Sequence, residues 1–139
     1  MDNKWIYYGI FFNENIKKTL LKLTKVWLNI HNDSLPEDWT IYCDHVTIVY
    51  NDKSIERQKV AEEIEKILNT DVTLSINSIG VSSSAIALGV DYKTQNKHSH
   101  ITIATAPGVR PVESNNIIRW FPISGNFTVN GTIKKIVKK

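Results

Sequence analysis

The sequence predicts an α+β domain in which strands outnumber helices and the sheet is largely antiparallel. Short apolar runs rich in β-branched and aromatic residues recur along the whole chain, which is typical of strands. Only two long stretches carry apolar residues at helical spacing. Several neighbouring strand-like runs are joined by short polar turns, as in hairpins. The predicted order β-α-β-α-β-β-β-α-β-β therefore argues against a doubly wound parallel sheet.

The first half of the chain predicts two strand–helix units. Residues 5–12 are dense in aromatic and β-branched side chains and predict a buried strand. Residues 15–30 carry apolar side chains at three- and four-residue spacing, which predicts an amphipathic helix. A polar connection leads to a short strand at residues 44–50. Ser54 is a plausible N-cap for a second amphipathic helix at residues 55–69.

The second half predicts mostly strands. Two paired strands come first, then a third strand broken by Ala106-Pro107-Gly108, then a short helix that begins near Pro111. Two further strands close the chain. The predicted strands are residues 72–81, 85–92, 100–105, 121–124 and 127–137, and the predicted helix runs to Trp120.

Length and composition are those of a folded globular domain. The chain has 139 residues, of which 42% are apolar and 22% charged. We therefore expect one domain that spans residues 1–139. No apolar run approaches the roughly 20 residues of a membrane helix, so no membrane is expected as a partner. The first ten residues lack the features of a signal peptide, and we expect a cytoplasmic location.

Cysteine content and charge exclude two further classes. Cys43 is the single cysteine, so the chain forms no internal disulfide and no multi-cysteine metal site. The net charge of +3 is only mildly basic, and it lacks the dense basic patch of a protein that binds duplex DNA. The sequence does not predict an oligomeric state.

Two His-x-Thr triplets carry the strongest chemical signal. They are His45-Val46-Thr47 and His100-Ile101-Thr102, and each lies on a predicted strand. Side chains two residues apart on a strand point to the same face. Each histidine is therefore expected to project together with its threonine, while the apolar residue between them faces the core.

Two such pairs across a cleft suit in-line displacement at phosphorus. One neutral imidazole can take a proton from water while the other, protonated, donates to the leaving oxygen. The threonine hydroxyls can hold non-bridging phosphoryl oxygens as charge develops. This chemistry requires no metal or other cofactor. A single His-x-Thr is commonly a structural histidine, but two in matched strands favour catalysis.

A metal centre is a weaker alternative. His98 and His100 share one side of a predicted strand and resemble a two-histidine arm, but no acidic or cysteine partner stands at a recognisable spacing. Asp44 precedes the first motif and is expected to point to the opposite strand face from His45. We therefore predict no metal site and no orienting acid there.

Residues outside the motifs are candidate substrate contacts. Tyr7 shares a strand face with Gly9, where the missing side chain leaves room and the tyrosine ring can stack on a base. Packing within the sheet explains Tyr7 equally well. Ser114 and Asn115 follow the second motif and can contact phosphate or base, although helix capping is an equal explanation. Arg110 is either an anion-attracting residue or an exposed arginine without a partner.

The two motifs, 55 residues apart in a small α+β chain, resemble the 2H phosphoesterase superfamily. That group includes RNA 2′,3′-cyclic phosphodiesterases of LigT type, the cyclic phosphodiesterase domain of fungal tRNA ligases, and phage enzymes that degrade cyclic oligonucleotide signals. The resemblance covers nearly the whole chain. Residues 108–115 resemble the segment that follows the second motif in the tRNA-ligase-like and phage branches.

The resemblance implies a bilobal fold with pseudo-two-fold symmetry and a central cleft. It also implies that the chain is a phosphoric diester hydrolase in which His45, Thr47, His100 and Thr102 are catalytic. Two substrates stay open: an RNA or nucleotide 2′,3′-cyclic phosphate end, or a cyclic nucleotide or oligonucleotide messenger of antiviral signalling. The second would make the chain a phage counter-defence enzyme acting in the host cytoplasm. The alternative function is a nucleotide- or RNA-binding module without catalysis.

Overall fold

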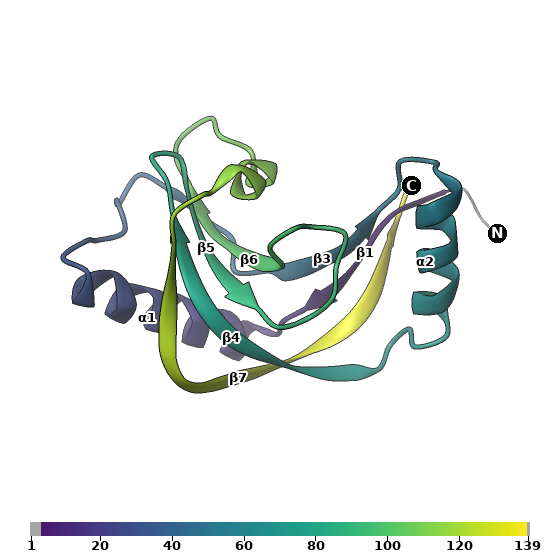
Figure 1. The fold of residues 1–139 in the computed structure, drawn as a ribbon, viewed down its shortest axis with the longest axis horizontal. Coiled ribbons are helices and arrows are strands. Elements are labelled where there is room, and N and C mark those ends of the chain that lie inside the picture. Colours follow the sequence, from purple (N-terminus) through teal and green to yellow (C-terminus); the bar gives the residue numbers. More distant parts are fainter. Residues whose placement is uncertain (1–3, 139) are drawn as a thin grey trace.

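In the computed structural model, which describes residues 4–138, one antiparallel sheet curves until its last strand pairs with a strand near its other end (Figure 1). The strands follow the order β2-β6-β3-β1-β7-β4-β5, and β5 also pairs with β6, which closes the ring. The helices α1 and α2 lie outside the sheet at opposite sides of the view. The elements in chain order are β1 (Trp5–Phe11), α1 (Glu14–Ile30), β2 (Thr40–Ile41), β3 (His45–Tyr50), α2 (Ile55–Glu65), β4 (Asp71–Val81), β5 (Ala85–Val90), β6 (His100–Thr105), the 3₁₀ helix η1 (Pro111–Asn116) and β7 (Trp120–Val137).

The core forms because apolar residues alternate along the motif strands and repeat on one side of α1. Val46 and Ile101, the middle residues of the two His-x-Thr triplets, are 1% and 0% exposed. Burial of such side chains contributes roughly 1.5–3 kcal/mol each. Leu20 and Leu28 of α1 belong to the same core cluster. Asn13 caps α1 by accepting a hydrogen bond from the amide of Ile16.

The α+β class and the largely antiparallel sheet are confirmed. The predicted strands at residues 5–12 and 44–50 correspond to β1 and β3, and Ser54 caps α2 as expected. All the strands in the described part of the chain belong to one hydrogen-bonded sheet. The two-lobed arrangement therefore stays a prediction. So does the single-domain organisation, whose ends at residues 1–3 and 139 lie outside the described part.

Two helix ends were wrong, and one short strand was missed. The second helix ends at Glu65 rather than at residue 69, because Asn69 adopts a left-handed φ of 65° and donates its amide to Ile133 in β7. The helix after residue 110 is a 3₁₀ turn that ends at Asn116. The short strand β2 lies within the segment expected to be a polar connection.

The two strands expected at the end of the chain are one long strand, β7. Its pairing with β4 shifts where Ile76 opposes Phe127 and Ser78 opposes Pro122, so β7 carries extra residues there. Gly125 lies in this interruption with a positive φ of 113°, a conformation that glycine adopts without strain. The break in the sequence pattern thus marks a bulge and not a strand end.

A second bulge lies in β3, next to the first motif. Tyr8 pairs with Val49, but Gly9 pairs with Thr47, so Ile48 is an extra residue. Ile48 and Val49 are consecutive and both buried. The alternation of faces is therefore reversed after the bulge, and Tyr50 returns to the face that carries the first motif.

The contact between β3 and β6 is the sparsest seam of the ring. Val46 and Ile101 are the one residue pair that joins the two strands in register, and just before β3 the amide of Cys43 donates to the Thr102 carbonyl. The other neighbouring strands of the ring share longer ladders. Within the described residues, no helix is long and apolar enough to cross a membrane.

Candidate active site

A cavity of about 510 Å³ lies over the seam between β3 and β6 and gathers all four motif side chains. Because Val46 and Ile101 are paired in an antiparallel register, His45 lies across from Thr102 and Thr47 lies across from His100. Two motifs far apart in sequence thus occupy adjacent strands. The cavity lining is Tyr7, Tyr42, Asp44, His45, Thr47, Tyr50, Arg57, Gln95, Asn96, His100, Thr102, Arg110, Pro111, Val112 and Asn115.

The ring of His100 is fixed by a backbone carbonyl. Its Nδ1 lies 2.8 Å from the carbonyl oxygen of His98, so Nδ1 carries the proton and Nε2 is the nitrogen that is free to accept one. The side chain is 9% exposed. Burial lowers the pKa of His100 below the usual value, although the bond to the His98 carbonyl acts in the opposite direction. His100 is therefore a neutral base at neutral pH.

His45 is held by aromatic packing and by its own threonine. Its ring packs against Phe11 with centroids 4.9 Å apart and against Tyr7 with centroids 5.2 Å apart. Its Nε2 lies 3.1 Å from the Thr47 hydroxyl. Nδ1 is buried and has no hydrogen-bond partner among residues 4–138. Nε2 is therefore the nitrogen that can reach a substrate.

Burial lowers the pKa of His45, and the nearby His100 lowers it further. Asp44 has the opposite effect, because its negative charge favours the imidazolium. Asp44 is part of the cavity lining, and the strand face to which its side chain points stays a prediction. Lys17 of α1 holds the Asp44 carboxylate at 2.8 Å.

Gly9 lets the two strands meet behind His45. A Cβ at this position would lie 2.8 Å from the carbonyl oxygen of Val46 and 3.5 Å from Cδ2 of His45. The room that the sequence predicted beside Tyr7 is therefore filled by the histidine ring.

Thr102 is oriented by Ser114, a residue that was expected to contact substrate. The hydroxyls of Thr102 and Ser114 lie 2.9 Å apart, and Ser114 is 1% exposed. Ser114 lies behind Thr102 and is absent from the cavity lining, whereas Asn115 lines the cavity. This geometry suits Ser114 to a role in positioning Thr102. Contact between Asn115 and the substrate stays a prediction.

Tyr50 was missed by sequence reasoning. Strand alternation from His45 and Thr47 puts Tyr50 on the opposite face, and only the bulge at Ile48 brings it back. Its ring is 48% exposed and stacks on Tyr7 at 5.7 Å with planes 8° apart. Together the two rings form an aromatic wall of the cavity.

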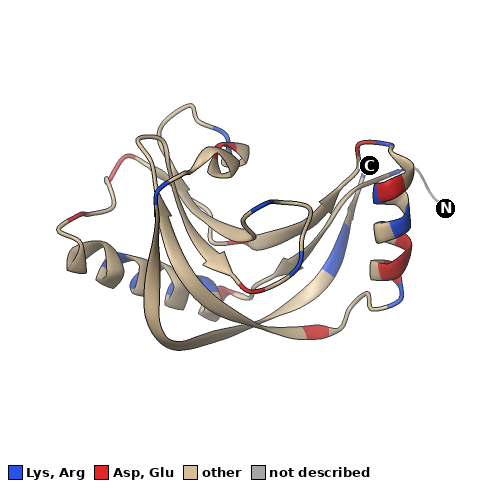
Figure 2. Cartoon of the chain, viewed as in Figure 1, with Lys and Arg blue, Asp and Glu red and all other residues tan. Residues whose placement is uncertain are grey.

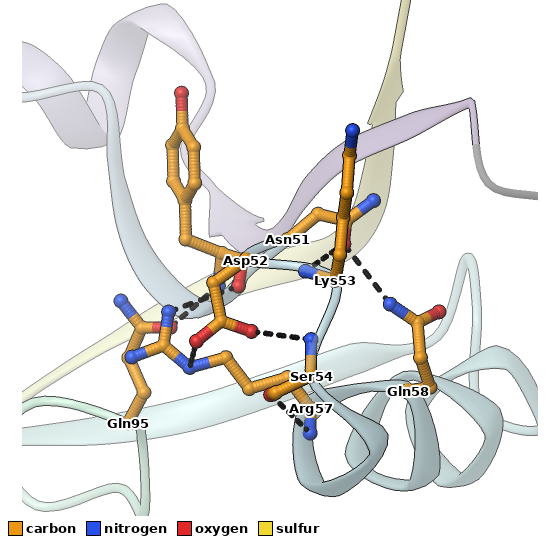
Figure 3. Close-up of polar contacts among 8 residues, drawn as sticks. Asn51, Asp52, Lys53, Ser54, Arg57, Gln58 and Gln95 are labelled. Carbon is orange, nitrogen blue, oxygen red and sulfur yellow. Dashed lines mark hydrogen bonds and ion pairs between the residues drawn. The ribbon is translucent and has the colours of Figure 1, made fainter.

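Arg57 and Gln95 were also missed, because both come from segments remote from the motifs. Arg57 of α2 donates to the carbonyl of Tyr50 at 3.1 Å and contacts Asp52 at 3.4 Å. The side-chain oxygen of Gln95 accepts a hydrogen bond from the Tyr50 backbone amide (Figure 3). The backbone amide of Gln95 donates to the Ile48 carbonyl. The register pairing of β3 with β6 ends at Val46, and beyond that point the loop supplies the partners of these backbone groups.

Arg110 lines the same cavity as Arg57. The cavity thus contains two guanidinium groups, which suit an anionic substrate. The sequence left the role of Arg110 open between anion attraction and simple exposure, and its place in the lining favours the first.

The side chain of His98 turns away from the cavity. Its ring stacks on Trp120 with centroids 3.7 Å apart and planes 7° apart, and its Nε2 lies 3.1 Å from the Ser78 hydroxyl. His98 therefore anchors the carbonyl that holds His100. Across residues 4–138, no three His, Cys, Asp or Glu side chains gather as metal ligands.

The chain was also compared with known protein families. The family model of the fungal tRNA ligase phosphodiesterase domain matches residues 23–138, which include both motifs. The chain belongs to this family. It is of 2H phosphoesterase type, so the resemblance noted in the sequence is confirmed.

The match to the fungal tRNA ligase phosphodiesterase family begins within α1. Tyr7 and Gly9 of β1 consequently lie outside the matched range. No curated protein matches the sequence. Membership of the phosphodiesterase family supports a hydrolase that acts on RNA or cyclic-phosphate substrates in general.

Proposed function

We propose that the chain hydrolyses a cyclic nucleotide or oligonucleotide phosphodiester at a ribose 2′ or 3′ oxygen, with two histidines as acid and base and without a metal. The observation that carries this proposal is the convergence of two imidazoles and two threonine hydroxyls on one cavity. The phosphodiesterase family to which the chain belongs supports the reaction class.

The hydrogen-bond partners favour His100 as the base. Its Nδ1 proton is held by a carbonyl, so Nε2 can take a proton from the attacking water. The water oxygen forms a bond to phosphorus while the bond from phosphorus to the ribose oxygen breaks on the opposite side. His45 then protonates the departing oxygen. Burial lowers the pKa of His45 overall, and the negative charge of Asp44 opposes that shift. Thr47 and Thr102 hold the non-bridging oxygens.

Two further groups support a nucleotide substrate. The rings of Tyr7 and Tyr50 offer a stacking wall, and stacking on an aromatic ring contributes roughly 1–3 kcal/mol per base. Asn115 lies on the same cavity and carries both donors and acceptors for a base or phosphate. We also propose that two lobes are related by a pseudo-two-fold axis. The antiparallel pairing of Val46 with Ile101, the middle residues of the two motifs, supports this relation.

The competing substrates can be separated by product chromatography. The panel contains nucleoside 2′,3′-cyclic phosphates, RNA with a 2′,3′-cyclic end, and cyclic di- and trinucleotides. Cleavage of cyclic trinucleotides without action on 2′,3′-cyclic AMP would favour the messenger and a counter-defence role. The opposite selectivity favours RNA end processing. Full activity is expected in EDTA, and dependence on a divalent metal would contradict the mechanism.

The acid and base assignments have a separate test. His45→Ala should lose activity on a ribose leaving group but recover much of it on a p-nitrophenyl phosphodiester, whose leaving group needs no proton. His100→Ala should stay inactive on both substrates. The exposed His31 at the end of α1 provides the control, and His31→Ala should behave as wild type. Equal rescue of both variants would refute the assignment.

A nucleotide-binding module without turnover is the second candidate. Burial lowers the pKa of both motif histidines, so neither ring is readily protonated at neutral pH, and a neutral pair favours binding over acid catalysis. Calorimetric titration with nucleotides separates the two functions. A pure binder would show no turnover and only a modest loss of affinity in His45→Ala, whereas an enzyme would lose turnover.

A further inference from the structure

A second cavity of about 660 Å³ lies beside the catalytic cavity, between α2 and the loop that joins β5 to β6. Arg57 and Gln95 line both cavities, so the two spaces share a wall. Each volume alone is within the roughly 300–1,000 Å³ typical of small-molecule sites. The second cavity is lined by Ile48, Val49, Glu56, Arg57, Val60, Glu63, Ile64, Tyr92, Lys93, Thr94 and Gln95.

The loop wall of this cavity is held in place by hydrogen bonds. The Ser99 hydroxyl donates to the Tyr92 carbonyl at 2.6 Å and lies 2.8 Å from the Thr94 hydroxyl. Gln95 ties the same loop to the bulge of β3 through the Ile48 carbonyl. The second cavity is therefore preformed and needs little ordering when a ligand enters.

The surface of the second cavity suits a planar aromatic group. Ile48 and Val49 contribute a buried apolar floor. Val60, which is 43% exposed on α2, is the apolar wall on one side, and Tyr92 supplies an aromatic ring from the loop. An apolar slot with one aromatic wall accepts any nucleobase, because every base has a flat face.

Charge decides where a phosphate can lie. Both signs alternate along α2 (Figure 2), and Glu56 and Glu63 face the second cavity. These two carboxylates outnumber Lys93, the one basic side chain that lines this cavity alone, and they accept hydrogen bonds from base amines or ribose hydroxyls. Arg57 lies at the shared wall, and its guanidinium group is oriented by the Tyr50 carbonyl and by Asp52. The phosphate position is therefore at the wall.

We propose that the second cavity holds the nucleoside attached to the reacting nucleotide, with the linking phosphate at Arg57. The inference rests on the proposed phosphodiesterase function and specifies its substrate class. The substrate is then an oligonucleotide of at least two units, and a cyclic mononucleotide fills only the catalytic cavity.

The test compares adenosine 2′,3′-cyclic phosphate with ApA that ends in a 2′,3′-cyclic phosphate. In the wild type, kcat/KM for the dinucleotide should exceed that for the mononucleotide roughly five-fold or more, since one added stacked base contributes about 1–3 kcal/mol. Val60→Trp fills the second cavity and should abolish this preference, while kcat/KM for the mononucleotide stays within about two-fold. Glu62→Trp, on an exposed position of α2 outside both cavities, should keep the preference.

A second variant guards against misfolding of Val60→Trp. Tyr92→Leu keeps an apolar side chain but removes the aromatic wall, and it should reduce the preference for the dinucleotide several-fold. Equal kcat/KM for the two substrates in the wild type, or an unchanged preference in both variants, would overturn the inference.

The binding step is measured separately so that failure of catalysis does not hide the result. Fluorescence titration uses the 3′-phosphates of deoxyadenosine and of its dinucleotide, which lack the 2′ oxygen. If neither cyclic substrate is cleaved, the proposed function fails. Tighter binding of the dinucleotide that is lost in Val60→Trp would still support the second cavity, and equal binding of both probes would refute it.

Discussion

Gly9→Ala tests whether the close approach of β1 and β3 positions the catalytic histidine. The new methyl group would lie 2.8 Å from the Val46 carbonyl oxygen, 3.3 Å from Cε1 of Phe11 and 3.5 Å from Cδ2 of His45. The first of these atoms is backbone in a paired strand and cannot rotate away. The strands must therefore separate by a few tenths of an ångström or more, and the ring of His45 moves with them.

The magnitude follows from these contacts. An extra methyl group in a well-packed site costs about 1–3 kcal/mol of folding free energy, and for a domain of this size that corresponds to a fall in Tm of roughly 4–12 °C. A displacement of a catalytic group by about 1 Å lowers the rate by on the order of 100-fold, so a shift of a few tenths of an ångström should lower it several-fold. Gly9→Ala should thus reduce kcat/KM far more than its loss of stability explains.

Gly131→Ala provides the matched control. Its methyl group would lie 2.5 Å from Cγ2 of Ile10 and 3.0 Å from Cε1 of Phe12, so it overfills the core without facing His45. Both variants are melted by circular dichroism, and kcat/KM is measured at 15 °C, well below either midpoint. We expect both to lose stability and only Gly9→Ala to lose most of its activity. Equal activity of the two variants at matched stability would refute the reasoning.

The remaining predictions concern groups around the motifs. Ser114→Ala removes the partner of the Thr102 hydroxyl and should lower kcat several-fold with little change in KM, since a hydrogen bond contributes about 1 kcal/mol; an unchanged kcat in steady-state assays would count against it. His98→Ala frees the carbonyl that binds Nδ1 of His100 and should move one limb of the pH–rate profile, whereas His98→Phe, which preserves ring stacking, should restore the wild-type limb. Because burial lowers the pKa of His45 and His100, the bell-shaped profile of kcat/KM should have both limbs below pH 6.5. Stability should depend on pH as well, because the folded state favours the neutral rings. This contribution is fully present above pH 6.5, the pKa in the unfolded chain, and is lost as the pH falls toward the lower folded-state pKa values. Denaturant titrations at pH 7.5 and 5 would measure the loss.

Local sequence pattern was enough to predict the motif pairs. Alternation on a strand depends only on backbone geometry, so His45 and Thr47 share a face, and so do His100 and Thr102. The pairing of β3 with β6 is a different matter. It depends on the whole order of the sheet, and nothing near either motif encodes a partner 55 residues away in the chain. The resemblance to a family supplied that expectation.

Irregular backbone accounts for the residues that the sequence missed. The extra residue at Ile48 reverses the alternation and brings Tyr50 to the cavity. That position carries no glycine, the usual sequence signal for an irregular backbone. Arg57 lines the cavity from α2 and Gln95 lines it from a loop tied to the same bulge, so both were hidden for the same reason.

The single register pair between β3 and β6 has a consequence for how the protein loses function. Each side of that junction carries one half of the acid–base machinery, and local openings start where backbone bonds are fewest. Local opening at this junction would separate His45 from His100 while the longer ladders stay intact. Mild denaturant should accordingly inactivate the molecule before its circular dichroism changes, so the catalytic assembly is less durable than the barrel that carries it.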